Sequence, residues 1–445
     1  MVGFECQFPT SGGCLVYYMS QGGYGMDLSN QIENSFSRRG FMKGALLGAG
    51  ALTLSSRLAS AEMLLAGKTA SDIHGMGVEK GLVRINANEN PLGASPRAIE
   101  AVAQHMFEMN RYSFSTDLPL KLHKHHDISF GDIELDFEDP ASFRKLREMN
   151  RVLVSAGSGP IVQMIGVMGV GDGNGEAIES IPGYGQITRV FESFKMAGMN
   201  TNVVRVPTKG DFEQDLDAIK AAITPRTTLI CLTNPNNPTG ALIPYDELVS
   251  FVDSVPSNIT ILLDEAYMHF NRIPGYTDGV KLALSRDNVV VTRTFSKIYG
   301  LAGMRIGYAI ASKPLLDKMM LHMGFGGGLT VLITYAASAA IEDYSFVNRT
   351  LQVTNDGKDS LMAEFDAMGL KYTPSHTNFM IVDLGRDSRR VVSALRKKGV
   401  FVRSGYSYAT RESNPLENHI RISIGTPDEL EVFMSELKQV MGAAS

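Results

Sequence analysis

Short apolar runs rich in β-branched residues alternate with amphipathic stretches along the middle of the chain. Residues 152–155 form the first such run, and residues 161–170 after it are an apolar stretch of helical character. The other predicted strands are residues 177–181, 201–206, 228–232, 259–263, 289–292 and 306–310. Helical patterns lie between many of them, such as residues 215–223 and 245–252. This alternation predicts an α/β domain with a mostly parallel, buried sheet.

The pattern changes in the C-terminal part of the chain. A long helical stretch is predicted from Leu329 to about Met368, and shorter strands and helices follow it. These are strands 378–384, 400–403 and 419–424, a helix over 388–398 and a last helix from Pro427. Together they predict a smaller C-terminal α+β domain. The expected divisions are 62–111 for an N-terminal arm and part of the small domain, 112–328 for the large domain, and 329–445 for the connecting helix and small domain.

Residues 37–43 and the small-residue stretch after them have the pattern of a bacterial export signal. A charged segment with paired arginines precedes the apolar residues 44–56, and Ala59-Ser60-Ala61 then forms a small-x-small cleavage pattern. The paired arginines resemble the twin-arginine signal, whose pathway carries folded proteins. We therefore expect residues 1–61 to be a leader, with Met26 as an alternative start, and the twin-arginine export machinery to deliver the protein to the periplasm.

Composition and charge narrow the classes of protein without naming one. The 445 residues carry 42 basic and 47 acidic side chains, and the resulting net charge of −5 gives no support for nucleic-acid binding. A hydrophobic content of 44% excludes a wholly disordered chain, and three cysteines cannot build a disulfide framework. No apolar run reaches the roughly 18 residues that a membrane span needs.

Two motifs that could suggest a ligand have simpler explanations. The glycine-rich residues 169–175 follow a predicted helix and precede a strand, which is the reverse of the order in a dinucleotide-binding loop, so they predict a turn. Residues 121–127 contain three histidines, but the lysines among them would repel a cation and the spacing is not that of a zinc site. We expect a solvated surface segment there and no metal.

Three polar clusters follow consecutive predicted strands. Residues 234–240 come after one strand, residues 264–267 end the next, and Lys297 and Arg305 follow the strand at 289–292. Because residues past the carboxyl ends of parallel strands share one crevice, an acid, an amide, a phenol, a lysine and an arginine should meet there. Pyridoxal phosphate needs such a set: a lysine for a Schiff base, a carboxylate at the pyridine nitrogen, and cationic and hydroxyl groups for the phosphate.

With these motifs in order, the chain from about Arg84 to Val440 resembles fold-type I aminotransferases of class I/II, most of all the histidinol-phosphate aminotransferase branch. The stretches that carry the resemblance are residues 86–93, 110–112, 233–240, 264–267, 296–297, Arg305 and residues 421–425. The resemblance implies the fold-type I architecture, pyridoxal 5'-phosphate as cofactor, and ping-pong transfer of an amino group between an amino acid and a 2-oxo acid. It also implies a homodimer with shared sites.

The resemblance assigns a role to each matching residue. Lys297 would hold the cofactor as a Schiff base and then move the proton from the substrate, and Asp264 would keep the pyridine nitrogen protonated. Tyr267 and Asn237 would hydrogen-bond the phenolic oxygen, and Tyr184 would stack on the ring. The residues implied at the phosphate are Ser158, Gly159, Ser296, Arg305 and, from the neighbouring subunit, Tyr112.

The resemblance places the substrate near two arginines. Arg421 would bind the substrate carboxylate or its equivalent, and Arg403 and Asn90 are implied as further substrate contacts. Histidine biosynthesis is normally cytosolic, so the expected export favours an amino acid substrate, such as an aromatic or otherwise bulky one. Histidinol-phosphate aminotransferase proper, a same-fold decarboxylase or lyase, and a non-catalytic binding module stay open as alternatives.

Overall fold

The computed structural model describes residues 81–112, 117–129, 140–322, 329–410 and 413–442. The expected leader at 1–61, its twin-arginine motif and the alternative start at Met26 lie outside the described residues. Within the described ranges, none of the helices combines the length and the apolar character that crossing a membrane requires.

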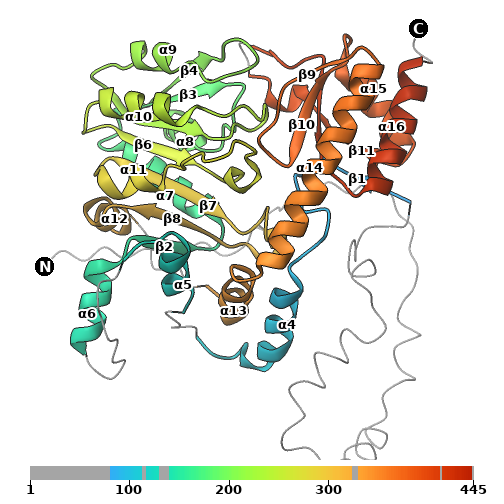
Figure 1. Ribbon diagram of the computed structural model, residues 1–445. Coiled ribbons are helices and arrows are strands. Elements are labelled where there is room, and N and C mark those ends of the chain that lie inside the picture. Colours follow the sequence, from blue (N-terminus) through green and yellow to red (C-terminus); the bar gives the residue numbers. More distant parts are fainter. Residues whose placement is uncertain (1–80, 113–116, 130–139, 323–328, 411–412, 443–445) are drawn as a thin grey trace, which may run out of the picture. The chain divides into compact units, whose positions relative to one another are not determined.

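A seven-stranded sheet forms the centre of the larger part of the structure, in the order β2-β8-β7-β6-β5-β3-β4 (Figure 1). The strands are β2 (Val152–Ser155), β3 (Glu176–Ile181), β4 (Asn202–Pro207), β5 (Thr227–Thr233), β6 (Thr260–Asp264), β7 (Val289–Thr294) and β8 (Gly307–Ala311). Neighbours from β7 to β4 are parallel, and β8 runs antiparallel to both β7 and β2. The prediction of a mostly parallel α/β sheet is confirmed.

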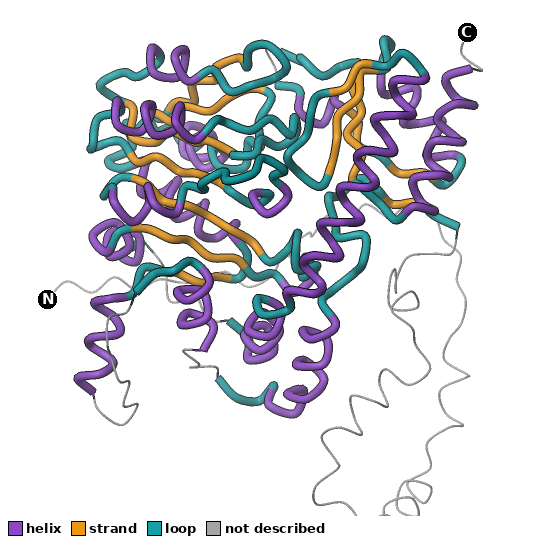
Figure 2. Tube along the Cα trace, in the orientation of Figure 1, coloured by secondary structure: helices purple, strands orange, loops and turns teal. Residues whose placement is uncertain are grey.

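Helices cover both faces of this sheet, as the purple and orange segments of Figure 2 show. One face packs against α7 (Ser158–Val170), α8 (Arg189–Met196) and α12 (Lys313–Met320) in one hydrophobic cluster. A second hydrophobic cluster on the opposite face contains residues of six helices: α4 (Pro96–His105), α5 (Asp117–His125), α9 (Leu216–Ala221), α10 (Tyr245–Ser254), α11 (Val280–Ser285) and α13 (Val331–Ala340). Burial on both faces explains why the strands read as continuous apolar runs.

The C-terminal part contains a separate hydrophobic cluster around a four-stranded antiparallel sheet. Its strands, in spatial order, are β12 (Arg403–Ser404), β13 (His419–Ser423), β10 (Phe379–Asp383) and β9 (Lys371–Tyr372), accompanied by α15 (Ser388–Lys397) and α16 (Pro427–Gly442). The N-terminal strand β1 (Val83–Arg84) pairs in parallel with β11 (Val400–Phe401), so the start of the described chain completes this part. The smaller α+β domain is thus as predicted.

The long helical stretch predicted from Leu329 to about Met368 is helical in the structure, but it is divided into two helices. The first is α13, and the second is α14 (Tyr344–Ala367). Asp343 begins the second helix as its N-cap, because its side chain accepts a hydrogen bond from the backbone N–H of Phe346. It also accepts from the Ser95 hydroxyl at 2.7 Å, which ties the break to α4.

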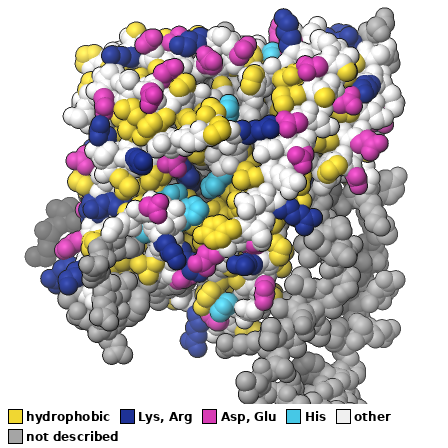
Figure 3. Space-filling view, in the orientation of Figure 1, with side chains coloured by type: hydrophobic (Ala, Val, Ile, Leu, Met, Phe, Trp, Pro, Cys, Tyr) yellow, Lys and Arg dark blue, Asp and Glu magenta, His cyan; other side chains and the backbone are white. Residues whose placement is uncertain are grey.

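The prediction of a solvated surface segment at residues 121–127 is wrong. His123 is buried on α5, where Nδ1 lies 2.7 Å from the carbonyl oxygen of Pro119 and Nε2 accepts from the N–H of Arg151. The rings of His125 and His126 lie in contact, and histidine side chains gather near the middle of the face shown in Figure 3. By contrast, the turn predicted at residues 169–175 is confirmed between α7 and β3.

Candidate active site

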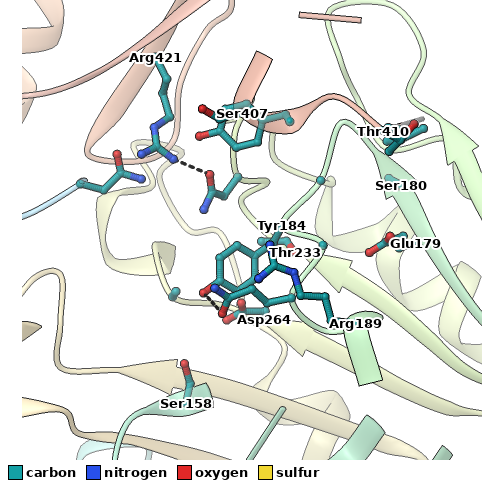
Figure 4. A pocket seen from close by; sticks show the side chains of 18 of the residues that line it. Ser158, Glu179, Ser180, Tyr184, Arg189, Thr233, Asp264, Ser407, Thr410 and Arg421 are labelled. Atoms are coloured by element: carbon teal, nitrogen blue, oxygen red, sulfur yellow. Dashed lines mark hydrogen bonds between the residues drawn. The ribbon is translucent and has the colours of Figure 1, made fainter. Parts of the chain in front are cut away.

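A cavity of about 1310 Å³ opens at the carboxyl ends of β5, β6 and β7 and is closed on its other side by residues of β12 and β13. Most of the residues predicted to act line it together (Figure 4). They are Ser158, Tyr184, Asn237, Asp264, Tyr267, Ser296, Lys297, Arg305, Arg403 and Arg421. The convergence follows from the parallel sheet, which brings the ends of its strands to one edge.

Lys297 lies just after β7 with its amine deep in the cavity. Its Nζ donates hydrogen bonds to the backbone oxygens of Asn88 at 3.0 Å and Ala87 at 3.3 Å. Burial disfavours the charged ammonium, and the nearby positive charge of Arg421 opposes it further, so the pKa of Lys297 is lowered to about 8. About half of an amine with this pKa is neutral at pH 8, and the neutral form is the one that a nucleophile or base requires.

Asp264 ends β6 and is 3% exposed. Burial raises the pKa of this carboxyl to about 6, while the hydroxyl of Thr292, which donates to Oδ1 at 3.2 Å, favours its charged form. A buried carboxylate is costly unless a cation pairs with it. Its position therefore suits a cationic ring nitrogen of a ligand in the cavity.

The start of α7, Ser296 and Arg305 form the anion-binding end of the cavity. Ser158 is the first residue of α7, and Gly157 before it has φ +89°. A Cβ added at Gly157 would lie only 2.8 Å from Nη2 of Arg305. The absence of a side chain at Gly157 leaves this guanidinium in place beside the helix start. Unpaired N–H groups and the dipole at a helix N-terminus attract an anion.

The two hydrogen-bonding residues expected at the ring have partners within the protein. The hydroxyl of Tyr267 accepts from Nδ2 of Asn88 at 3.0 Å, and Oδ1 of Asn237 accepts from Nη1 of Arg421 at 2.8 Å. In Figure 4, Arg421 projects from the wall of the cavity opposite Asp264. Tyr184 is 37% exposed, and its hydroxyl donates to Gln186.

Comparison with known proteins identifies the family of this chain. The family described as Aminotransferase class I and II matches residues 80–437. The chain belongs to this family. Histidinol-phosphate aminotransferase 2 of Hydrogenovibrio crunogenus is 35% identical over 371 residues, which cover 82% of this chain and 91% of that protein. Histidinol-phosphate aminotransferase of Moorella thermoacetica is 32% identical over 366 residues, covering 81% and 86%.

A solved structure agrees with the fold. The crystal structure of histidinol-phosphate aminotransferase from Sinorhizobium meliloti in complex with pyridoxal-5'-phosphate has a TM-score of 0.70 to this chain. It shares 24% sequence identity, and the match covers 90% of this chain and all of the other. This likeness confirms the predicted fold-type I architecture. The match to the family over residues 80–437 confirms the predicted aminotransferase family.

The cavity of this aminotransferase fits pyridoxal phosphate by the chemistry of its donors. The buried Asp264 matches the ring nitrogen, the amine of Lys297 matches the reactive carbonyl carbon, and the anion-binding end matches the phosphate. When bound, the cofactor supplies an electron sink for the carbanion formed at the substrate carbon. In that case Asp264 would hold a proton at the ring nitrogen, and Lys297 would take and return the proton at the substrate carbon.

Three predicted residues of the aminotransferase do not line the cavity. Nδ2 of Asn90 donates to the carbonyl oxygens of Lys297 and Ile298, so this side chain supports the loop that carries the lysine. Tyr112 is 90% exposed, and Gly159 follows Ser158 on α7 with no atom within 4 Å of an added Cβ. The predicted contacts of Asn90 and Tyr112 with substrate and cofactor stay predictions.

Several residues that line or support the site were not predicted from the sequence. Asn88 has φ 55° and is bonded through its N–H and its Oδ1 to the Ser423 hydroxyl, while its Nδ2 reaches Tyr267. Its place inside the motif at 86–93 was the available signal. Ser407 and Tyr408 also line the cavity, and their place between Arg403 and Arg421 in the chain could have indicated them.

The lowered pKa of Lys297 predicts a pH dependence of cofactor capture. Below its pKa of about 8 the amine is protonated and cannot attack, so the rate at which the apoprotein captures pyridoxal phosphate should rise with pH through a midpoint near 8. Arg421→Gln removes a cation that opposes protonation, so it should move the midpoint upward. Stopped-flow absorbance at a series of pH values measures this midpoint.

The matched control is Arg272→Gln, because Arg272 is a partly exposed arginine paired with Asp359. We expect this variant to keep the wild-type midpoint. A wild-type midpoint at the ordinary lysine value of about 10.4, or the same midpoint in Arg421→Gln and wild type, would contradict this account of the site.

Proposed function

We propose that this aminotransferase uses pyridoxal phosphate to transfer the amino group of an amino acid, bulky or aromatic in its side chain, to a 2-oxo acid. The observation that carries the proposal is the cavity in which Lys297, Asp264 and Arg421 line one space. Arg421 is 5% exposed there and is suited to a carboxylate by its planar guanidinium. Lys297 supplies the base, and Asp264 supports the cofactor ring.

A second candidate substrate is histidinol phosphate. The relatives at 35% and 32% identity carry the name histidinol-phosphate aminotransferase. Arg403 and Arg421 both line the cavity, and their strands β12 and β13 place them at paired positions. Two guanidinium groups suit a phosphate as well as a carboxylate, so this candidate differs from the first in the anionic group that the arginines receive.

A donor panel tests the proposed function. The holoenzyme should transfer amino groups from at least one bulky amino acid to 2-oxoglutarate, measured by chromatography of the amino acid products. Lys297→Ala should lower kcat by about two to four orders of magnitude, since it removes the base. Lys281→Ala, on the exposed side of α11, should retain full activity. If the enzyme is active with histidinol phosphate and with none of the amino acids, histidinol phosphate is the substrate and the first proposal is wrong.

We also propose that the enzyme is a homodimer in which Tyr112 reaches the cofactor phosphate of the partner subunit. Tyr112 does not line the cavity of its own chain and is 90% exposed. Phe107 and Met109, a few residues earlier, are 85% and 66% exposed. Such a concentration of apolar side chains on one short segment is typical of a surface that another chain covers.

Mixed dimers test this sharing of sites. Lys297→Ala and Tyr112→Ala subunits should each give weak enzymes, but a hybrid of the two contains one site with both residues intact. Random reassortment of equal amounts should therefore restore about a quarter of the wild-type activity, because half of the dimers are hybrids with one of two sites working. Activity that stays at the average of the two parents, or a monomer by light scattering, would rule the arrangement out.

We propose, finally, that the enzyme is exported to the periplasm by the twin-arginine route. Arg38 and Arg39 precede the apolar residues 44–56, and a cofactor-dependent enzyme benefits from folding before export. Replacing both arginines by lysine should leave active enzyme in the cytoplasm, as cell fractionation with marker enzymes would show. Unchanged periplasmic activity in that double variant would refute the route.

A further inference from the structure

Two buried polar atoms in the wall of the cavity have no hydrogen-bond partner among the described residues beyond the contact between their own two side chains. They are Nε of Arg421 and the hydroxyl oxygen of Tyr408. The other two guanidinium nitrogens of Arg421 are occupied, since Nη1 donates to Asn237 and Nη2 to the carbonyl oxygen of Asn86. A buried donor without a partner is costly, so both atoms are suited to a ligand in the cavity.

The fold brings Tyr408 to Arg421 through a short connection. Arg403 on β12 pairs in register with Arg421 on β13, and the 3-10 helix η4 (Gly405–Tyr408) begins two residues after Arg403. The ring centre of Tyr408 lies 5.7 Å from Cζ of Arg421. The hydroxyl and the free edge of the guanidinium therefore belong to one corner of the cavity.

The backbone of η4 is held firmly, so the position of Tyr408 is defined. The Ser404 hydroxyl caps the turn by accepting from the N–H of Tyr406 at 3.2 Å. A Cβ at Gly405 would lie 1.7 Å from the carbonyl oxygen of Leu416, so only glycine lets the turn pack this closely. A preorganised group loses little conformational entropy when it binds a ligand.

The charges around the hydroxyl favour an anion. Arg421 acts on it through its charge and through a side-chain hydrogen bond, Arg403 acts on it through its charge, and Tyr267 is the other titratable group near it. Burial raises the pKa of Tyr408, with the arginines opposing that shift, so its hydroxyl stays protonated at neutral pH and can donate a hydrogen bond.

We propose that Tyr408 is a substrate-recognition residue whose hydroxyl, together with Nε of Arg421, donates to the oxyanion of the substrate. The oxyanion is the carboxylate of an amino acid or the phosphate of histidinol phosphate, which share this chemistry. The inference rests on the proposed function and adds to it a group that anchors the substrate but takes no part in proton transfer.

The test is the conservative variant Tyr408→Phe in the holoenzyme. Because a hydrogen bond to a charged group is lost, KM for the oxyanion substrate should rise about tenfold. The value of kcat should change by less than about threefold, since the variant leaves Lys297 untouched. The dissociation constants of succinate and of inorganic phosphate, measured by calorimetry on the holoenzyme, should show which oxyanion loses affinity and so distinguish the two sources.

Two controls separate recognition from a structural role. Tyr406→Phe alters the neighbouring tyrosine, whose ring stacks under Arg389 at 4.1 Å, and should keep the wild-type KM. A substrate analogue without the oxyanion, such as an amino acid amide or histidinol, should react equally well with wild type and Tyr408→Phe.

The outcomes separate this inference from the function on which it rests. An unchanged KM in Tyr408→Phe, or an equal loss with the neutral analogue, would overturn the role of Tyr408 while leaving the aminotransferase intact. Absence of transamination by the wild-type enzyme with every donor would instead overturn the proposed function.

Discussion

The buried carboxylate of Asp264 is the constraint around which the active site is arranged. It ends the central strand β6, and the structure satisfies it with a hydroxyl hydrogen bond from Thr292. The next residue, Glu265, is also buried but has its own cation, because Arg293 donates to it at 2.6 Å. The charge of Glu265 is therefore paired with an arginine of the protein, whereas Asp264 is suited to pair with a cationic ligand.

The positive charges of the cavity act together. Lys297, Arg305 and Arg421 line one space, and the two arginines disfavour the ammonium form of the lysine. The same charges attract an anionic cofactor and an anionic substrate. One arrangement could thus supply both a reactive amine and binding energy, with the proposed phosphate-binding end at the start of α7 and the proposed substrate end at β12 and β13.

The strands and the convergence of the site could be predicted because both follow from local pattern and one rule of sheet geometry. The predicted strand at 152–155 matches β2, and Asp264 and Lys297 meet because β6 and β7 are parallel. Contacts between distant segments could not be predicted. The N–H of Asn88 donates to the hydroxyl of Ser423, which lies 335 residues away in the chain. Nε2 of the buried His123 accepts from the N–H of Arg151. The amide of Asn90 likewise donates to the carbonyl oxygens of Lys297 and Ile298, 207 and 208 residues away.

The most direct test of the central claim is a single-turnover reaction of the purified holoenzyme with candidate amino acids in the absence of any 2-oxo acid. We expect one amino acid to remove the absorption band of the lysine-bound cofactor, with one oxo acid released per site as the cofactor takes up the amino group. A band that persists with every amino acid and with histidinol phosphate would contradict it. Release of carbon dioxide with recovery of the band would identify a decarboxylase instead.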